Sequence, residues 1–144
     1  WHHALGAAIA PLRDAGVLII GSGSMTHNLR ALFLVRPPID APPVSAVTDF
    51  TDWMAERMAA GATDDILHAV DRAPHGHFHH PTMDHILPLF VAMGAAGGAS
   101  TDVKATRLHA SVTYSLLAKD VYAFGQRTYC LWRRHAGRSC SLPR

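Results

Sequence analysis

Two histidines occupy positions where an imidazole could take part in chemistry, and His27 is the first of them. It follows the apolar, β-branched run Val17–Ile20 and the glycine-rich turn Gly21–Ser24. Such a run is typical of a strand buried on both faces, and glycine accepts the positive φ that a sharp turn needs. Open α/β sheets bind ligands at the carboxyl ends of their strands, so His27 is a candidate for catalysis or ligand binding. A histidine that only caps or packs is the alternative.

His85 is the second candidate. It stands near the start of the apolar segment Ile86–Met93, for which Thr82 could serve as a helix cap. Pro88 lies inside this segment and lacks a backbone N–H, so we expect a kink or a late helix start beside His85. The ring would then lie near the amino end of a helix, with Asp84 as its acidic neighbour.

The segment before His85 is rich in histidine, a residue that occurs 11 times in the chain. If this segment is extended, His75, His77 and His79 share one face. Neutral imidazole suits Zn, Cu, Fe and Ni, so these residues together with His80 could form a non-catalytic metal-binding module. A solvated loop is the competing interpretation for the first three.

Several common site motifs do not fit this chain. The dinucleotide fingerprint would need a glycine where Thr26 stands, and the phosphate loop would need a lysine that is absent. The nucleophile elbow would need its serine at the centre of G-x-S-x-G. Asp64 and Asp65 are adjacent and diverge around a helix, so they fit as partners of its dipole. Without a carboxylate-rich cluster, a metal-dependent hydrolase is less favoured.

Helical and strand patterns surround these candidates. The spacing of apolar residues, capping residues and breakers predicts helices over Ala4–Arg13, over His27–Val35 with Thr26 as cap, over Phe50–Met58 up to Gly61, and from Thr63 to Pro74. A strand is expected near Leu108–Thr113, and Tyr114–Tyr122 fits either strand or helix. Together with the strand before His27, this order predicts an α/β fold with a mixed central sheet flanked by helices.

The composition is that of one ordinary globular domain. Of 144 residues, 49% are hydrophobic and 17% charged, and the net charge is +2. No basic stripe interleaved with aromatic residues is present, which argues against a nucleic-acid partner. No apolar run approaches the roughly 20 residues that cross a bilayer, so no membrane role is expected. Cys130 and Cys140 imply no disulfide framework, and the reducing cytoplasm is the expected compartment.

Residues 126–144 differ from the rest of the chain. Five arginines, both cysteines and Trp132 occur there without clean periodicity. We expect an atypical basic tail that lies outside the domain formed by residues 1–125. A foreign ending would fit the same composition.

Two long blocks carry a resemblance to a known family. The first reads G-V-L-I-I-G-S-G-S-M-T-H-N-L-R, and the second reads H-P-T-M-D-H-I-L-P-L-F-V-A-M-G-A-A-G. With F-x-x-W-M between them and V-Y-A-F-G after them, they resemble the class III extradiol ring-cleavage dioxygenases of the LigB superfamily, in the DOPA-dioxygenase branch. The resemblance covers roughly Ala4–Gly125.

The resemblance implies an enzyme that opens a catechol-type ring beside its two hydroxyls with O2. It implies a single non-haem Fe(II), with Zn(II) as the alternative. Carried over residue by residue, His27 would be the acid/base group and also a metal ligand, and His85 would lie at the metal. Asp84 matches the acidic neighbour of that histidine, and Asn28 would orient His27 or a substrate oxygen. A plain helix-start role for Asn28 is equally compatible.

One departure from the family pattern matters. The amino-terminal half of these enzymes normally contributes further metal-binding histidines, and this chain begins after that region. His2 and His3 are not in the matching context and do not replace them. The sequence therefore predicts an incomplete domain, the carboxyl-terminal portion of such an enzyme, with poor activity by itself. Apolar surface left uncovered would favour self-association into a homo-oligomer.

Overall fold

A computed structural model describes residues 1–97 and 102–125 of the chain. The helices are α1 (His2–Ile9), α2 (Pro11–Asp14), α3 (Leu29–Val35), α4 (Ser45–Ala60), α5 (Thr63–Leu67), α6 (Ala69–Arg72), α7 (Gly76–His79) and α8 (Leu87–Gly97). The strands are β1 (Ala105–His109), β2 (Val112–Thr113), β3 (Leu117–Ala118) and β4 (Val121–Phe124). The predicted tail lies outside the described residues, as does the end of the glycine-rich stretch after α8.

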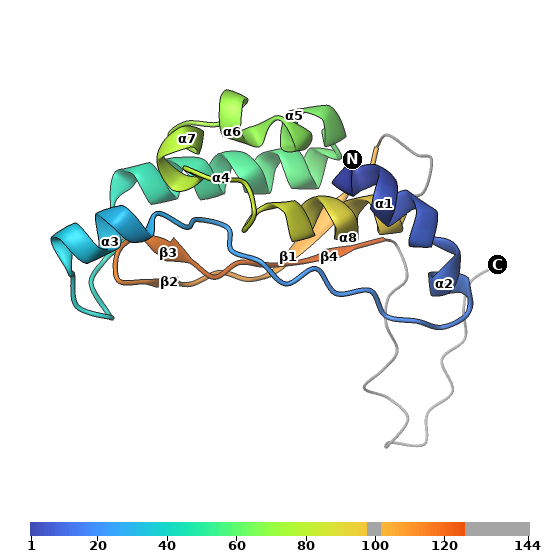
Figure 1. The fold of residues 1–144 in the computed structure, drawn as a ribbon, viewed down its shortest axis with the longest axis horizontal. Coiled ribbons are helices and arrows are strands. Elements are labelled where there is room, and N and C mark those ends of the chain that lie inside the picture. Colours follow the sequence, from blue (N-terminus) through green and yellow to red (C-terminus); the bar gives the residue numbers. More distant parts are fainter. Residues whose placement is uncertain (98–101, 126–144) are drawn as a thin grey trace, which may run out of the picture.

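The elements form two layers (Figure 1). Helices α4 to α8 and α1 lie on one side of the strands, and α3 lies at one end of the molecule. The long helix α4 turns Val47, Phe50, Met54 and Met58 inward, all of them with no exposed surface. Phe50, Met54 and Met58 were predicted from their helical spacing, together with Trp53, which is only partly buried. The face packs against β1 and β3 and forms the centre of the core.

The strands pair only with antiparallel neighbours among the described residues. β1 pairs with β4, with an irregularity between Arg107 and His109, and β2 pairs with β3 in a short hairpin. The ambiguous stretch Tyr114–Tyr122 therefore contains a turn, β3 and the start of β4, and no helix. The predicted α/β class is confirmed, with short antiparallel strands beneath a helical layer.

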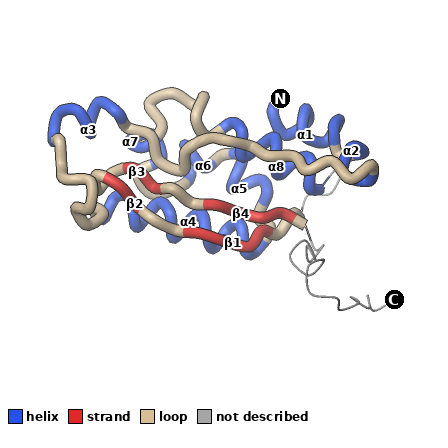
Figure 2. The backbone as a smooth tube through the Cα atoms, turned by 90° about the horizontal axis from the view of Figure 1, so that it is seen from below, coloured by secondary structure: helices blue, strands red, loops and turns tan. Residues whose placement is uncertain are grey.

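The central strand predicted at Val17–Ile20 is wrong. This stretch is extended but has no strand partner among the described residues, and it runs along the molecule from α2 to α3 (Figures 1 and 2). Val17, Leu18 and Ile20 are exposed by 47%, 62% and 76%, so the segment is not buried on both faces as the apolar run predicts. The run has the composition of a strand, but a strand forms only when an adjacent strand accepts and donates its backbone hydrogen bonds.

Several helix boundaries also differ from prediction. The first helix is divided at Ala10, because Pro11 cannot donate a backbone hydrogen bond and starts a new turn. α3 begins at Leu29, and its cap is Asn28, whose side-chain oxygen accepts from the Ala31 N–H at 2.9 Å. The predicted cap, Thr26, points into the core instead.

Three other boundary predictions have clearer outcomes. α4 ends at Gly61, which adopts a φ of 73°, as predicted from its position. The next helix, α5, begins at Thr63. Its N-cap residue is Ala62, so no side chain caps it. The late helix start near Pro88 is confirmed, because α8 begins at Leu87. Thr82 is therefore too far from α8 to be its cap.

Helices α1 and α8 pack backbone to backbone at two glycines. A methyl group on Gly94 would clash with the His3 carbonyl, and one on Gly6 would clash with the Val91 carbonyl. Gly94 lies within α8, and its lack of a side chain permits this contact. Arg13 of α2 donates to the carbonyls of Ala95 and Ala96 near the carboxyl end of α8.

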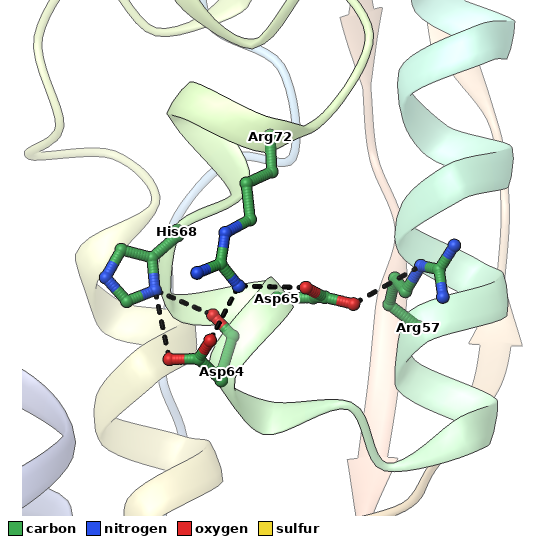
Figure 3. Close-up of polar contacts among 5 residues, drawn as sticks. All are labelled: Arg57, Asp64, Asp65, His68 and Arg72. Carbon is green, nitrogen blue, oxygen red and sulfur yellow. Dashed lines mark hydrogen bonds and ion pairs between the residues drawn. The ribbon is translucent and has the colours of Figure 1, made fainter.

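Charged side chains connect α4, α5 and α6 at the surface (Figure 3). Arg72 donates to Asp64 at 2.6 Å and to Asp65 at 2.9 Å, and Arg57 approaches Asp65 at 3.7 Å. The Arg72 guanidinium lowers the pKa of Asp64. The two carboxylates thus hold neighbouring helices together and do not form a catalytic pair. Among the described residues, no helix combines the length and the apolar character that a membrane crossing requires.

Candidate functional site

The structure brings His27 and His85 together, although 57 residues separate them in the sequence. Their ring centroids are 3.4 Å apart and the ring planes are inclined by 30°. Both residues are half-buried, His27 just before α3 and His85 just before α8. Two imidazoles from distant segments therefore share one location with access to solvent.

Backbone hydrogen bonds hold the two segments in register. The Ser24 N–H donates to the His85 carbonyl at 2.8 Å, and the His27 N–H donates to the His79 carbonyl at 3.0 Å. The His80 ring adds a third connection, with Nε2 at 2.9 Å from the Met25 carbonyl. Because a carbonyl can only accept, Nε2 must carry the proton. These contacts connect the loop that carries His27 to the segment that leads to His85.

Thr26 and Asn28 fix the loop on both sides of His27. The fully buried Thr26 hydroxyl donates to the Leu116 carbonyl and accepts from the Ala118 N–H, both at 2.7 Å. Asn28 donates from Nδ2 to the Phe78 carbonyl at 2.6 Å while it caps α3. Both ends of the Asn28 amide are thus engaged with the protein, and a contact to substrate stays a prediction.

Electrostatics favour a neutral His27 ring. Partial burial lowers the pKa of His27, and the neighbouring His85 lowers it further, while Asp84 acts in the opposite direction. Asp84 lies 3.0 Å from His85 Nε2, and a hydrogen bond from Thr82 lowers the Asp84 pKa. A neutral imidazole can accept a proton or bind a metal ion, so His27 is in the protonation state that both roles need.

A shallow hollow of about 380 Å³ lies beside this pair. Ile20, Leu87 and Val91 provide apolar lining, and Asp84 and His2 are its ionisable residues. The rings of His27 and His85 do not line it. The hollow therefore borders the candidate site through Asp84, and most of its lining is apolar.

The histidine-rich segment does not form the shared face that an extended chain would give. His75 adopts a left-handed conformation and α7 follows it, so the side chains diverge. His75 approaches Asp49 at 3.4 Å, and the exposed His77 approaches Asp71 at 3.1 Å. His79 is fully buried with Nε2 at 2.7 Å from the Ala46 carbonyl. The expectation of three aligned rings is wrong, because local turns decide their directions.

The sequence analysis missed the structural roles of Thr26 and His80. Thr26 was expected to cap a helix, but it forms the contact with β3; His80 was considered only as a metal ligand. Burial lowers the pKa of His80 to about 4, which keeps the ring neutral. No local spacing pattern distinguishes such a buried, hydrogen-bonded histidine from an exposed one.

The ligand set for a metal ion is incomplete among the described residues. No group of three or more His, Cys, Asp or Glu side chains is arranged there to hold a metal ion. The donor chemistry of His27 and His85 nevertheless fits a borderline divalent metal, because both are imidazoles and one has a lowered pKa. The Asp84 carboxylate, 3.0 Å from His85 Nε2, is the acidic neighbour of this pair. These residues fit as part of a metal site.

Comparisons with known proteins show which family this chain is similar to. The family model for the catalytic LigB subunit of aromatic ring-opening dioxygenase matches residues 2–125. The 4,5-DOPA dioxygenase extradiol of Beta vulgaris is 37% identical over 123 residues, which are 85% of this chain and 43% of that protein. The Escherichia coli (strain K12) protein of the same name is 31% identical over 100 residues, 68% of this chain and 36% of its own length.

A solved structure has the same fold over much of the chain. An uncharacterized protein from Escherichia coli K12 superposes with a TM-score of 0.64 at 24% identity, covering 84% of this chain and 49% of the other. The chain thus spans less than half the length of the relatives it matches. Because the family model covers nearly all the described residues, the chain belongs to the LigB family of aromatic ring-opening dioxygenases.

Proposed function

We propose that this chain carries part of the catalytic centre of an extradiol dioxygenase, which opens a catechol-type ring with O2. One observation supports the proposal above all. His27 and His85, the histidines of the two family blocks, lie with their rings 3.4 Å apart although their segments are distant in sequence. The names of the relatives add support, since they are extradiol dioxygenases.

His27 and His85 would hold the metal ion, with Fe(II) favoured and Zn(II) as the alternative. When bound, Fe(II) supplies open positions at which a catecholate and O2 are held next to each other. Holding both reactants in place removes most of the entropic cost of their encounter. The preference for iron rests on the family resemblance, since imidazole ligands alone suit several divalent metals.

His27 would also act as the base for substrate. Its lowered pKa keeps Nδ1 or Nε2 able to accept a proton from a catechol hydroxyl at neutral pH. Once the ring has opened, the same imidazolium would return its proton to the product. Asp84, which opposes the lowering of the His27 pKa, would limit how far the basicity falls.

The site needs ligands beyond these two. We infer that they belong to the part of the fold that the relatives have and this chain lacks, so that residues 1–125 correspond to a carboxyl-terminal portion. The 144 residues alone would then bind iron weakly and turn over slowly.

The test uses this chain produced together with the portion of the Beta vulgaris relative that it does not match, called here the complementary portion. After anaerobic loading with Fe(II), a catechol and O2 are added and the ring-opened product is followed by its yellow absorbance. His27→Asn is expected to lower the rate about 100- to 10,000-fold, the usual contribution of a general base.

His77→Asn is the matched control, because this histidine is exposed and contacts Asp71 at the surface. It should leave the rate unchanged. Iron-dependent ring opening that is equally fast with His27→Asn would contradict the proposal, as would the absence of ring opening with a panel of catechols.

A further inference from the structure

The end of the molecule that α3 forms has an apolar, uncovered surface. None of the seven residues of this helix is buried. Phe33, Leu34 and Val35 are exposed by 65%, 76% and 69%, and Ile39 in the following loop by 59%. A helix of two turns is marginal in water by itself, and its stability comes from packing of its apolar residues. In the described part of the chain, these side chains face solvent instead.

The loop after α3, residues 36–44, is firmly attached to the fold. The Ile39 carbonyl accepts from the Tyr114 N–H at 2.9 Å, and the Val44 N–H donates to the Ser115 carbonyl at 3.1 Å. Four of the nine loop residues are proline, which fixes φ at each of these positions. Such a preorganised surface loses little conformational entropy when a partner covers it. We call α3 together with this loop the α3 surface.

The α3 surface is large enough for a stable interface. Besides the four apolar residues above, Pro38, Pro42 and Pro43 are exposed. Together these side chains present roughly 600 Å² of apolar area, at the upper end of what a monomeric protein exposes as one patch. A stable interface needs about 800 Å² from each partner. The polar side chains of the same surface can supply the rest.

The charges of the α3 surface fit a second copy of itself. Arg36 and Asp40 are both exposed, and neither forms an ion pair within residues 1–97 and 102–125. In a twofold interface between identical chains, each contact between two different residues occurs twice. Arg36 of each copy can therefore pair with Asp40 of the other. The net charge of residues 29–44 is only +1, from Arg30, Arg36 and Asp40, so two copies repel each other little.

Both ends of the described chain lie away from the α3 surface. Helix α1, which begins at His2, and the end of β4 at Phe124 lie towards the opposite end of the molecule from α3 (Figures 1 and 2). Chain that continues from either end therefore starts far from this surface. This placement favours a second copy over a further segment of the same polypeptide.

We propose that the chain forms a symmetric dimer through the α3 surface. Leu34, the most exposed of the apolar residues of α3, lies at the centre of the interface, and two Arg36–Asp40 ion pairs lie beside it. Because α3 begins two residues after His27, the dimer also stabilises the helix next to the candidate site. The proposal does not depend on the dioxygenase chemistry, so association can be measured without activity.

The first test is sedimentation equilibrium of the 144-residue chain, which should show a species of twice the chain mass at micromolar concentration. Leu34→Lys should raise the Kd of the dimer at least about thirtyfold, as for a central interface residue. Leu108→Lys is the matched control, because Leu108 on β1 is exposed by 64%, and it should leave the Kd unchanged. The circular dichroism spectra of both variants should match that of the parent.

The second test exchanges the two charges. Arg36→Asp alone places two acidic residues opposite each other, and Asp40→Arg alone places two basic ones, so each should weaken the dimer about tenfold. The double variant restores both ion pairs and should dimerise within about threefold of the parent. An equimolar mixture of the two single variants should likewise form a heterodimer, because the opposite charges then meet.

The third test concerns the rest of the fold. A single-chain fusion of this chain to the complementary portion should also dimerise, and Leu34→Lys should weaken that dimer as well. A monomeric fusion in which residues 29–44 are protected from hydrogen exchange would overturn the proposal, because the rest of the fold would then cover the α3 surface. A monomeric 144-residue chain would overturn it too, as would a dimer that neither Leu34→Lys nor the single charge reversals weaken.

Discussion

Histidines near the site differ in function because their surroundings differ. His27 and His85 are half-buried and stack on each other, which leaves them able to meet solvent or a ligand. His79 and His80 are buried and use Nε2 to hold backbone carbonyls. Both buried rings keep an Nδ1 atom without a hydrogen-bond partner among the described residues. Histidine is therefore a candidate base at position 27, whereas at positions 79 and 80 it forms hydrogen bonds that stabilise the fold.

The buried His80 should make folding stability depend on pH. Its pKa is about 4 in the folded chain and near 6.5 when unfolded, so between these values the unfolded chain binds a proton that the folded chain does not. Above about pH 6.5 the ring is neutral in both states and His80 does not lower the free energy of unfolding. As the pH drops towards 4, protonation of the unfolded chain lowers this free energy by roughly 3 kcal/mol. His80→Gln keeps a donor for Met25 and should flatten the pH dependence.

Urea unfolding at a series of pH values measures this effect. His77→Gln is the control on the same segment, since His77 is exposed, and it should leave the slope of stability against pH as in the parent. A slope that His80→Gln does not change would contradict the assignment of a neutral, buried ring.

Thr26 should contribute more to stability than an ordinary threonine. Thr26→Val removes the hydroxyl that serves both the Leu116 carbonyl and the Ala118 N–H, and leaves two buried backbone groups unpaired. The expected loss is about 3 kcal/mol in the free energy of unfolding. Thr48→Val, at a site where the hydroxyl bonds only the exposed Ser45 carbonyl, should change it by less than about 0.5 kcal/mol. Chemical denaturation measures the free energy of unfolding of both variants. An equally small loss in both would contradict the role given to Thr26.

At the scale of elements, the α1–α8 contact depends on the absence of side chains. The two helices touch at Gly6 and Gly94, and Arg13 then connects α2 to the end of α8. This packing places the start of α8, and with it His85, at a defined position. It also lets α1 contribute His2 to the hollow beside Asp84.

Gly94→Ala tests this contact. The added methyl would meet the His3 carbonyl, so α1 must move away and expose part of α8. Although alanine favours helix formation over glycine, we expect a net loss of about 1–3 kcal/mol, as for other overpacked sites. Ala8→Ser on the exposed face of α1 is the control and should be close to neutral. Thermal unfolding of both variants provides the measurement, and a more stable Gly94→Ala variant would show that the helices are not in close contact.

At the scale of the whole molecule, one side of the structure is well packed and another is not. The core under α4 is closed, with Phe50, Met54 and Met58 fully buried. The extended segment before His27 is exposed, and so are Phe33, Leu34 and Val35 of α3. His27 lies between this exposed segment and α3, so the candidate site borders the open region of the described structure.

This arrangement predicts weak metal binding by the chain alone. With two imidazoles near each other and no third ligand among the described residues, Fe(II) or Zn(II) at about 0.1 mM should raise the unfolding free energy by less than about 1 kcal/mol. The Cys130→Ser, Cys140→Ser double variant serves as the background, so that thiols of the tail do not contribute. Stoichiometric, tight binding that His27→Ala and His85→Ala abolish would contradict this prediction.

The sequence alone determined the features that depend on local pattern. The buried face of α4 and its end at Gly61 follow from helical spacing and from the positive φ that glycine accepts. The late start of α8 follows from the missing N–H of Pro88. The two family blocks identified His27 and His85 as candidates, because long ordered blocks carry more information than a short motif.

Only the tertiary structure decided the features that depend on partners. Val17–Ile20 has the composition of a strand, but a strand forms only where another strand can accept its hydrogen bonds, and the described residues provide none. Thr26 became a core contact and Asn28 the cap, because the position of β3 decides which side chain turns inward. The contact between the His27 and His85 rings depends on bonds between segments at least 50 residues apart, which local spacing does not encode.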